Sequence, residues 1–320
     1  EDGYFTDFIS NGVSTELCFV AFCAFTLIII FAGVQNGIER VSKIMMPILI
    51  VLSVIIAVYS VTRPGALAGV KYFLVPNVKN FSWMTVVSAM GQMFYSLSIA
   101  MGILITFGSY MKKDTAIEDS TRNVEVFDTG IAIMAGLMII PAVFAFSGGD
   151  PDTLQAGPSL MFITIPKVFQ NMGFGTVIGI VFFLLVLFAA VTSSIALTES
   201  AVSTFEDELG WGRKKATVLV GVIMLVLGSL SSLGYGPLAG IKIIGMQFLD
   251  LFDFLTNSVM MPIAALLTSL LVSRVVGIDK IEEEIIHGES AFRRKKVFVV
   301  MIKYLCPVFA IIILLSSVAN

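Results

Sequence analysis

The sequence predicts an all-α membrane protein that crosses the bilayer several times. Of its 320 residues, 57% are hydrophobic and only 13% are charged, and the mean hydropathy is +0.95. A water-soluble domain of this size does not need so apolar a composition. A hydrocarbon core about 30 Å thick takes roughly 20 apolar residues per spanning helix. We therefore expect a single membrane domain over residues 1–320 with eight transmembrane helices, at 17–34, 41–61, 83–110, 129–146, 177–205, 216–233, 246–276 and 297–318.

The basic residues predict the orientation of these helices. Lys and Arg accumulate in cytoplasmic loops, and most of the 20 basic residues here fall on one side of the predicted topology, including the runs Arg213–Lys215 and Arg293–Lys296. That side is predicted to be cytoplasmic, so both ends of the chain lie outside. The net charge of −3 adds little to this assignment.

The sequence lacks the usual residues of an enzyme. Cys18, Cys23 and Cys306 lie in apolar spans, where a thiol behaves as a small hydrophobe and indicates neither a disulfide nor a metal site. His287, the one histidine, lies in a charged loop, so no acid, base and nucleophile set is apparent. We expect no enzymatic activity, no organic cofactor and no nucleic-acid partner. The chain opens at Glu1 without a cleavable signal pattern, and we expect it to be part of a longer protein.

Two connections are long, at 62–82 and 147–176. The second holds the apolar run SLMFITIPKVF, which is too short to span and is flanked by Gly and Pro. It predicts either an extracellular lid over a vestibule or an ordinary amphipathic surface helix.

The second predicted span begins GIERVSKIMMP, with Gly37 and Pro47 near its cytoplasmic end. Glycine lowers the cost of unwinding and proline removes a backbone donor, so this end can open at low cost. A chance pairing of the two residues is the alternative.

Polar residues at mid-membrane depth gather in two spans. The third reads GQMFYSLSIAMG and places Gln92, Ser96 and Ser98 halfway along it. A broken helix there would offer backbone groups to an ion or a substrate, whereas a continuous helix would bond the hydroxyls back to its own carbonyls.

The fifth span reads FAAVTSSIALTES and places small and hydroxylated residues on one helical face. These residues are Ala189, Thr192, Ser193, Ala196 and Leu197. Hydroxyl and carbonyl oxygens suit a hard cation such as sodium, but such a face also serves plain helix packing.

Acidic residues within spans are functional candidates by default. Asp128 lies at the start of the fourth span, where it could instead cap a helix N-terminus. Glu199 lies in the fifth span, and Asp253 lies in the seventh without an obvious basic partner in any span.

Taken in order, several segments resemble the neurotransmitter:sodium symporter family. They are GIERVSKIMMP, GQMFYSLSIAMGILITFGSY, AGPSLMFITIPKVF, FAAVTSSIALTES followed by FEDELG, and MIKYLCPVFA. The resemblance implies a leucine-transporter-like inverted-repeat fold in which this chain lacks the first three transmembrane helices. It also implies sodium-coupled amino-acid symport by alternating access, in the bacterial inner membrane or the plasma membrane.

The resemblance further implies roles for individual residues. Sodium site 2 would comprise the Ala189 carbonyl, Thr192 and Ser193, and sodium site 1 would include Ser96 and Asp128. The substrate pocket would contain Tyr95, Ser98, Met101, Ser193 and Leu197. Gln92 and Asp253 would form the extracellular gate, and Gly37 and Pro47 the cytoplasmic one.

Two positions depart from the family pattern. Ala100 stands where the family usually has Gly in the helix break, and Ala132 stands where chloride-independent bacterial members are often acidic. Asp128 would supply the compensating negative charge, so we expect independence of chloride.

Met101 and Leu197 give the pocket an apolar end, which favours a neutral, hydrophobic or aromatic L-amino acid. The other partners expected are the lipid bilayer and a second copy of the chain, since the sequence is compatible with a homodimer. The alternatives are a proton- or sodium-coupled transporter of another family with the same fold, and a non-transporting scaffold or receptor.

Overall fold

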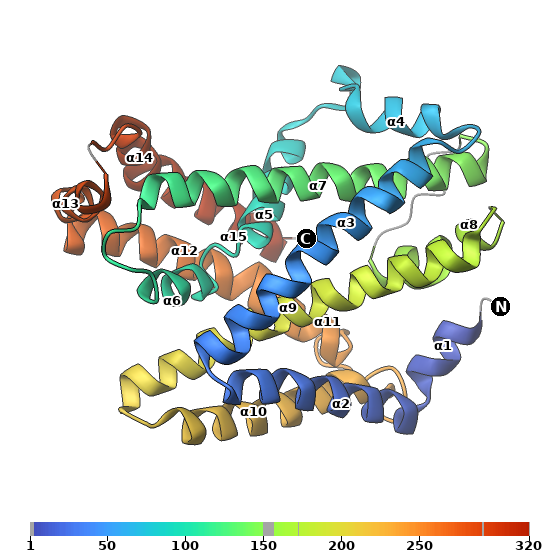
Figure 1. The fold of residues 1–320 in the computed structure, drawn as a ribbon, viewed down its shortest axis with the longest axis horizontal. Coiled ribbons are helices and arrows are strands. Elements are labelled where there is room, and N and C mark those ends of the chain that lie inside the picture. The colour runs from blue at the N-terminus through green and yellow to red at the C-terminus, as the bar shows by residue number, and fades with distance from the viewer. Residues whose placement is uncertain (1–2, 150–156, 172, 290, 320) are drawn as a thin grey trace. The chain divides into compact units, whose positions relative to one another are not determined.

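The computed structural model describes residues 3–149, 157–171, 173–289 and 291–319, and Figure 1 shows that they are almost entirely helical. Within those ranges the only β pairing is one isolated antiparallel bridge between Ile243 and Met246. The all-α membrane fold predicted from the sequence is therefore confirmed. The chain forms two compact units: residues 1–79, 129–198 and 205–240 make the first, and 80–128, 199–204 and 241–320 make the second.

Seven helices in the described part of the chain are long and apolar enough to cross a bilayer. They are α2 (Gly12–Phe31), η1 with α3 (Val34–Glu39 and Arg40–Val61), α7 (Ile117–Ser147), α9 (Gly175–Leu209), α10 (Arg213–Leu233), the run Phe248–Val276 and the run Lys295–Ser317. Each matches a predicted span, although α7 begins well before residue 129 because the polar turns at its start continue the helix. The remaining predicted span, 83–110, is broken into α5 (Trp83–Ser96) and α6 (Ile103–Ser109).

Three of the long runs contain wider π-helical turns, and in Val34–Val61 this turn is η1. Phe248–Val276 comprises α11 (Phe248–Asp253), η5 (Phe254–Met260), α12 (Met261–Leu270) and η6 (Leu271–Val276). Lys295–Ala319 comprises α14 (Lys295–Val300), η7 (Met301–Leu305) and α15 (Cys306–Ala319). Such turns are frequent at functional sites because they break the regular hydrogen-bond ladder.

The first unit has its core between α3, α7 and α9. A cluster of buried side chains there joins Leu49, Ile56, Met138, Ala142, Val143, Ile165, Val168, Phe169, Ile178, Phe182 and Leu185. Short helices complete this unit: α1 (Gly3–Ser10), α4 (Ala66–Leu74), η4 (Leu160–Thr164) and α8 (Ile165–Gln170). α2 lies beside α10 (Figure 1), where Phe19 packs over Gly228.

The predicted lid over 147–176 is described only in part, because 150–156 and 172 lie outside the described residues. Its apolar run forms η4 and α8, which bury Ile165, Val168 and Phe169 in the core of the first unit. The run is therefore a packed part of that core.

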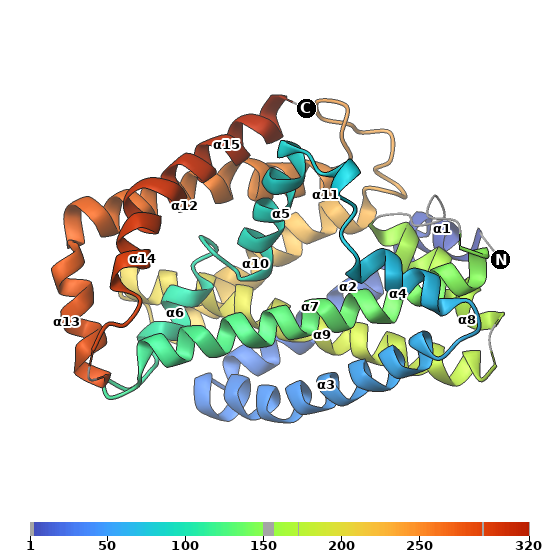
Figure 2. The same ribbon diagram turned by 90° about the horizontal axis from the view of Figure 1, so that it is seen from above.

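In the second unit α12 and α15 pack side by side (Figure 2), and α5 crosses them. Phe94, Met261, Ala265 and Ala310 form its buried centre. The short elements of this unit are η2 (Val78–Asn80, at its boundary) and α13 (Ile278–Gly288). A buried patch at this crossing fixes the end of α5, which leads directly into the helix break.

Gly69 tests the packing of α4 on α7. A Cβ atom at Gly69 would lie 2.7 Å from Pro141 Cα and 3.0 Å from the Ile140 carbonyl oxygen. Because backbone atoms cannot swing aside, Gly69→Ala should cost about 1–3 kcal/mol of stability, seen as a lower unfolding temperature in detergent. Gly130→Ala on α7, where nothing lies within 4 Å of the new Cβ, is the control and should not lower it. Equal unfolding temperatures for the two variants would contradict the packing described.

Candidate functional site

The third predicted span breaks at Leu97–Gly102. The backbone turns through left-handed conformations at Ser98 (φ 54°), Ala100 (φ 64°) and Gly102 (φ 78°). Such values are costly for residues with a Cβ and are common where surrounding structure holds a functional segment in place. The broken-helix interpretation is therefore the one that the structure adopts, and Ala100 does not prevent it.

The break leaves polar backbone groups at both helix ends. The amides of Leu97, Ser98 and Ile99 still reach back to the last turn of α5. No side chain caps the start of α6 in the described structure, so its first-turn amides remain available to a ligand. A half-helix start of this kind is positive and suits an anionic group.

One residue of α9 packs directly on the break. A Cβ at Gly102 would lie 2.7 Å from Ser200 Oγ, and the Ser200 hydroxyl donates to the Met101 carbonyl at 3.4 Å. Glycine is therefore required at 102 both by its positive φ and by the approach of Ser200.

Ser96 and Asp128 meet at the end of α5. The Ser96 hydroxyl donates to Asp128 Oδ1 at 2.5 Å, across 32 residues of sequence. Asp128 lies well inside α7, so the alternative that it caps a helix N-terminus is wrong. A carboxylate and a hydroxyl beside a broken helix are oxygen ligands of the kind that hard cations take.

The other predicted sodium ligands lie on α9 in the first unit. Thr192 donates to the carbonyls of Phe188 and Ala189, at 3.0 Å each. The Ala189 carbonyl and the Thr192 hydroxyl are therefore neighbours, while Ser193 and Leu197 have exposed side chains on this unit. Both interpretations of this face, ion binding and helix packing, are compatible with this geometry.

Gln92 and Asp253 line one cavity of about 350 Å³ within the second unit. Tyr95 and Asn257 line it too, and the Asn257 amide donates to Asp253 Oδ1 at 2.6 Å. Asn257 lies in the π-helical segment η5 and was missed from the sequence, although its spacing of four residues from Asp253 could have indicated it. The predicted extracellular gate residues thus share a cavity.

Gly37 and Pro47 fall in different parts of the second span. Gly37 lies in η1, where a Cβ would sit 2.1 Å from the Ile29 carbonyl oxygen of α2, and Pro47 lies inside α3. Gly37 is therefore needed for close packing of two backbones, a role that the sequence alone did not indicate.

Glu199 is fully buried in the second unit, where the Tyr110 hydroxyl donates to its Oε1 at 2.6 Å. Tyr110 follows the end of α6 and was not singled out from the sequence. The sequence signal that could have indicated Tyr110 is its place at the end of GQMFYSLSIAMGILITFGSY, a segment that resembles the family.

The candidate residues are divided between the units. Tyr95, Ser96, Ser98, Met101, Asp128, Gln92 and Asp253 belong to the second unit, and Ala189, Thr192, Ser193, Leu197, Gly37 and Pro47 belong to the first. In the described part of the chain no three His, Cys, Asp or Glu side chains cluster as a metal site. The oxygen sets found here are hydroxyls, carbonyls and single carboxylates.

Comparison with known proteins gives consistent matches. The model of the sodium:neurotransmitter symporter family matches residues 8–320. The uncharacterized sodium-dependent transporter YhdH of Bacillus subtilis is 33% identical over 98% of this chain and 69% of its own length. The uncharacterized sodium-dependent transporter MJ1319 of Methanocaldococcus jannaschii is 30% identical over 81% of this chain and 52% of its own length.

A solved structure is similar as well. The crystal structure of MhsT in complex with L-phenylalanine matches with a TM-score of 0.85 and 34% identity, over 98% of this chain and 70% of that one. A Haemophilus influenzae relative, also an uncharacterized sodium-dependent transporter, is 31% identical, with 91% of this chain and 62% of its own length covered. The chain thus spans between 52% and 70% of the length of these relatives.

A substitution at Gly102 tests the helix break at Leu97–Gly102. Gly102→Ala forces a Cβ into a left-handed residue and against Ser200 Oγ, which should cost about 1–2 kcal/mol from the backbone alone and more from the contact. The double variant Gly102→Ala with Ser200→Ala should recover only the part of this cost that comes from the contact with Ser200 Oγ. The unfolding temperatures of the two single variants and of the double variant measure that recovery. Full recovery in the double variant would show that the φ of Gly102 carries no cost.

Proposed function

This chain belongs to the sodium:neurotransmitter symporter family, whose members are transporters and not enzymes, and on that premise we propose that it couples sodium binding to the symport of a neutral amino acid. It is a multi-pass membrane protein with relatives in bacteria. The observation that carries the proposal is the Ser96–Asp128 hydrogen bond of 2.5 Å beside the break at Leu97–Gly102. It supports a sodium site made of side-chain and backbone oxygens at this point.

We propose Ser96 and Asp128 as ligands of the first sodium ion. A carboxylate supplies a full negative charge, which attracts a cation. In the absence of an ion the Ser96 hydroxyl donates to that carboxylate, so sodium would take the place of one hydrogen-bond donor. The sodium dependence named for the relatives YhdH and MJ1319 supports this role.

A second sodium ion is proposed at Ala189, Thr192 and Ser193. The Thr192 hydroxyl lies 3.0 Å from the Ala189 carbonyl oxygen, so rotation of the hydroxyl proton away from that carbonyl would leave both oxygens facing a cation. The exposed Ser193 hydroxyl supplies the next oxygen on the same helix.

The proposed substrate is a hydrophobic or aromatic L-amino acid. Tyr95 and Leu197 are about half exposed on their own units and present apolar surface, and Met101 adds a deformable side chain within the break. Ser98 and the amides that begin α6 would take the carboxylate of the substrate. The similarity to MhsT, whose structure contains L-phenylalanine, supports this class.

The proposed mechanism is alternating access. A ligand shifts a conformational equilibrium only by its difference in affinity for the two states. Sodium would favour the state in which the break and Asp128 hold their present geometry. The cavity around Gln92 and Asp253 would then close over the substrate. Finally, the Gly37–Pro47 segment would open towards the cytoplasm.

Sodium-driven uptake tests the proposal in proteoliposomes that contain the native protein. Thr192→Ala and Ser193→Ala remove ligand oxygens and should reduce uptake of neutral amino acids at least about tenfold at limiting sodium, since a charge-assisted contact is worth about 1.5–3 kcal/mol. Thr204→Ala is the matched control, because Thr204 is on the same helix and donates to the carbonyl of Ser200 at 2.8 Å in the same manner. Uptake driven by a pH gradient and indifferent to sodium would favour the proton-coupled alternative.

Chloride replacement tests the role of Asp128. Because Asp128 would provide the negative charge that other members take from chloride, exchanging chloride for gluconate should leave uptake unchanged. In Asp128→Asn that charge is lost, so any residual uptake should become dependent on chloride. Loss of uptake by the unmutated protein in gluconate would contradict this assignment.

A further inference from the structure

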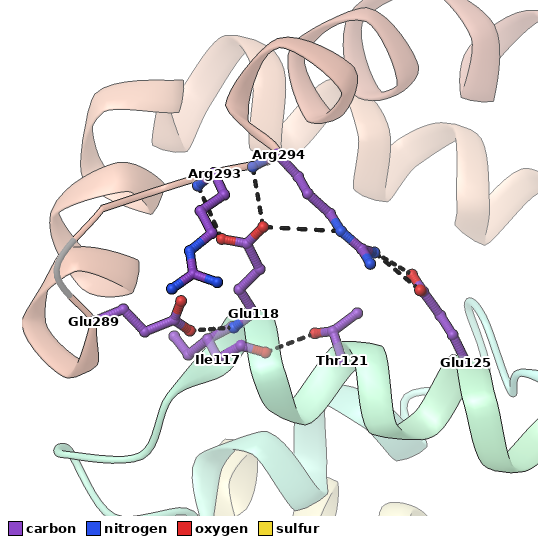
Figure 3. Close-up of polar contacts among 7 residues, drawn as sticks. All are labelled: Ile117, Glu118, Thr121, Glu125, Glu289, Arg293 and Arg294. Atoms are coloured by element: carbon purple, nitrogen blue, oxygen red, sulfur yellow. Dashed lines mark hydrogen bonds and ion pairs between the residues drawn. The ribbon is translucent and has the colours of Figure 1, made fainter.

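The start of α7 is bound to the connection between α13 and α14 by a network that lies away from the candidate site. The network, here called the clasp, consists of Glu118, Glu125, Glu289, Arg293 and Arg294, all in the second unit (Figure 3). It lies on the side of the bilayer predicted to be cytoplasmic.

The clasp begins with two reciprocal helix-end contacts. The backbone amide of Glu118, in the first turn of α7, donates to Glu289 Oε1 at 2.5 Å. In return the Glu118 carboxylate accepts from the backbone amides of Arg293 and Arg294, at 3.0 Å each. Each carboxylate thus satisfies amides that the other segment cannot pair by itself.

Arg294 adds an ion pair with a second acidic residue of α7, Glu125. Its Nη1 donates to both carboxylate oxygens of Glu125, at 3.1 and 2.9 Å, and its Nε lies 3.9 Å from Glu118 Oε1 (Figure 3). These hydrogen bonds raise the pKa of Arg294 above its usual value, so its charge persists at any working pH. Glu125 follows Glu118 at the spacing i+7, which places both on one stripe of α7.

The clasp is more than a surface ion pair. An exposed pair such as Arg294 with Glu125 contributes little by itself, but the Glu118 side chain is only 11% exposed. The backbones also approach closely, since a Cβ at Gly288 would lie 2.6 Å from the Thr115 carbonyl oxygen. The contact therefore holds two chain segments together at a defined distance.

Asp128 is the next acidic residue on this part of α7. It follows Glu125 by three residues, less than one helical turn, and it belongs to the last residues of α7 that are part of the second unit. The first turns of α7 are thus held at one end by the clasp and at the other by the Ser96–Asp128 hydrogen bond.

We propose that Glu118 and Arg294 are positioning residues for Asp128. The clasp keeps the first turns of α7 wound and in place, and so presents the Asp128 carboxylate to Ser96 and to sodium. Helix ends without capping partners fray, and fraying from Ile117 towards Asp128 would lower the fraction of molecules with the carboxylate in position. The apparent sodium affinity falls in proportion to that fraction. This inference rests on the proposed sodium role of Asp128.

The test compares Glu118→Gln and Arg294→Gln with the unmutated native protein. Both variants should raise the half-saturating sodium concentration for substrate binding about fivefold, with substrate affinity at saturating sodium unchanged. Hydrogen exchange should report faster exchange of the α7 amides at 117–125. Arg294→Lys should recover part of the loss, because it keeps a positive charge beside Glu118 and Glu125.

Glu282→Gln is the matched control. Glu282 pairs with Lys295 in the same basic run and, within the described residues, makes no hydrogen bond or ion pair with α7, so its removal should leave sodium half-saturation and α7 exchange unchanged. Faster α7 exchange in Glu118→Gln with unaltered sodium half-saturation would overturn the inference and leave the proposed function intact. An absence of sodium dependence in the unmutated protein would instead remove the proposed function, and the inference with it.

Discussion

The need of every backbone amide and carbonyl for a partner governs this structure. In apolar surroundings an unpaired group costs several kcal/mol, so spanning segments remain helical unless something else satisfies them. Leu97–Gly102 is the exception within the third predicted span, and the structure supports it from several sides. Ser200 reaches the Met101 carbonyl, and Phe94 anchors the end of α5 in the buried centre of the second unit.

The interruption concentrates chemistry at one place because it ends one helix and starts another there. The hydroxyl of Ser96, the last residue of α5, meets the carboxylate of Asp128 from α7. Tyr95, one residue earlier, lines the cavity that also contains Gln92 and Asp253. The candidate ion ligand and the candidate gate therefore depend on the same helix end, which gives a physical route by which ion binding can affect access to the cavity.

Two acidic residues of α7, Glu118 and Asp128, have different local roles. Glu118 is held by backbone amides and an arginine, so its charge is already compensated. Asp128 accepts the neutral hydroxyl of Ser96, and that leaves its charge available to a cation. This difference in partners separates a structural carboxylate from a candidate ligand, although both lie on the same helix.

The sequence by itself determined the membrane class, the places of the long apolar helices, the family resemblance and most candidate residues, because hydropathy and motif order are local properties. It left open whether the third span breaks and whether Asp128 caps a helix. Tertiary structure decided both: Ala100 accepts a left-handed backbone because its surroundings hold it there, and α7 begins at Ile117. It also brought together Ser96 with Asp128 and Glu118 with Arg294. Those pairs are far apart in the chain, and their contacts follow from how helices pack, which no local pattern of residues specifies.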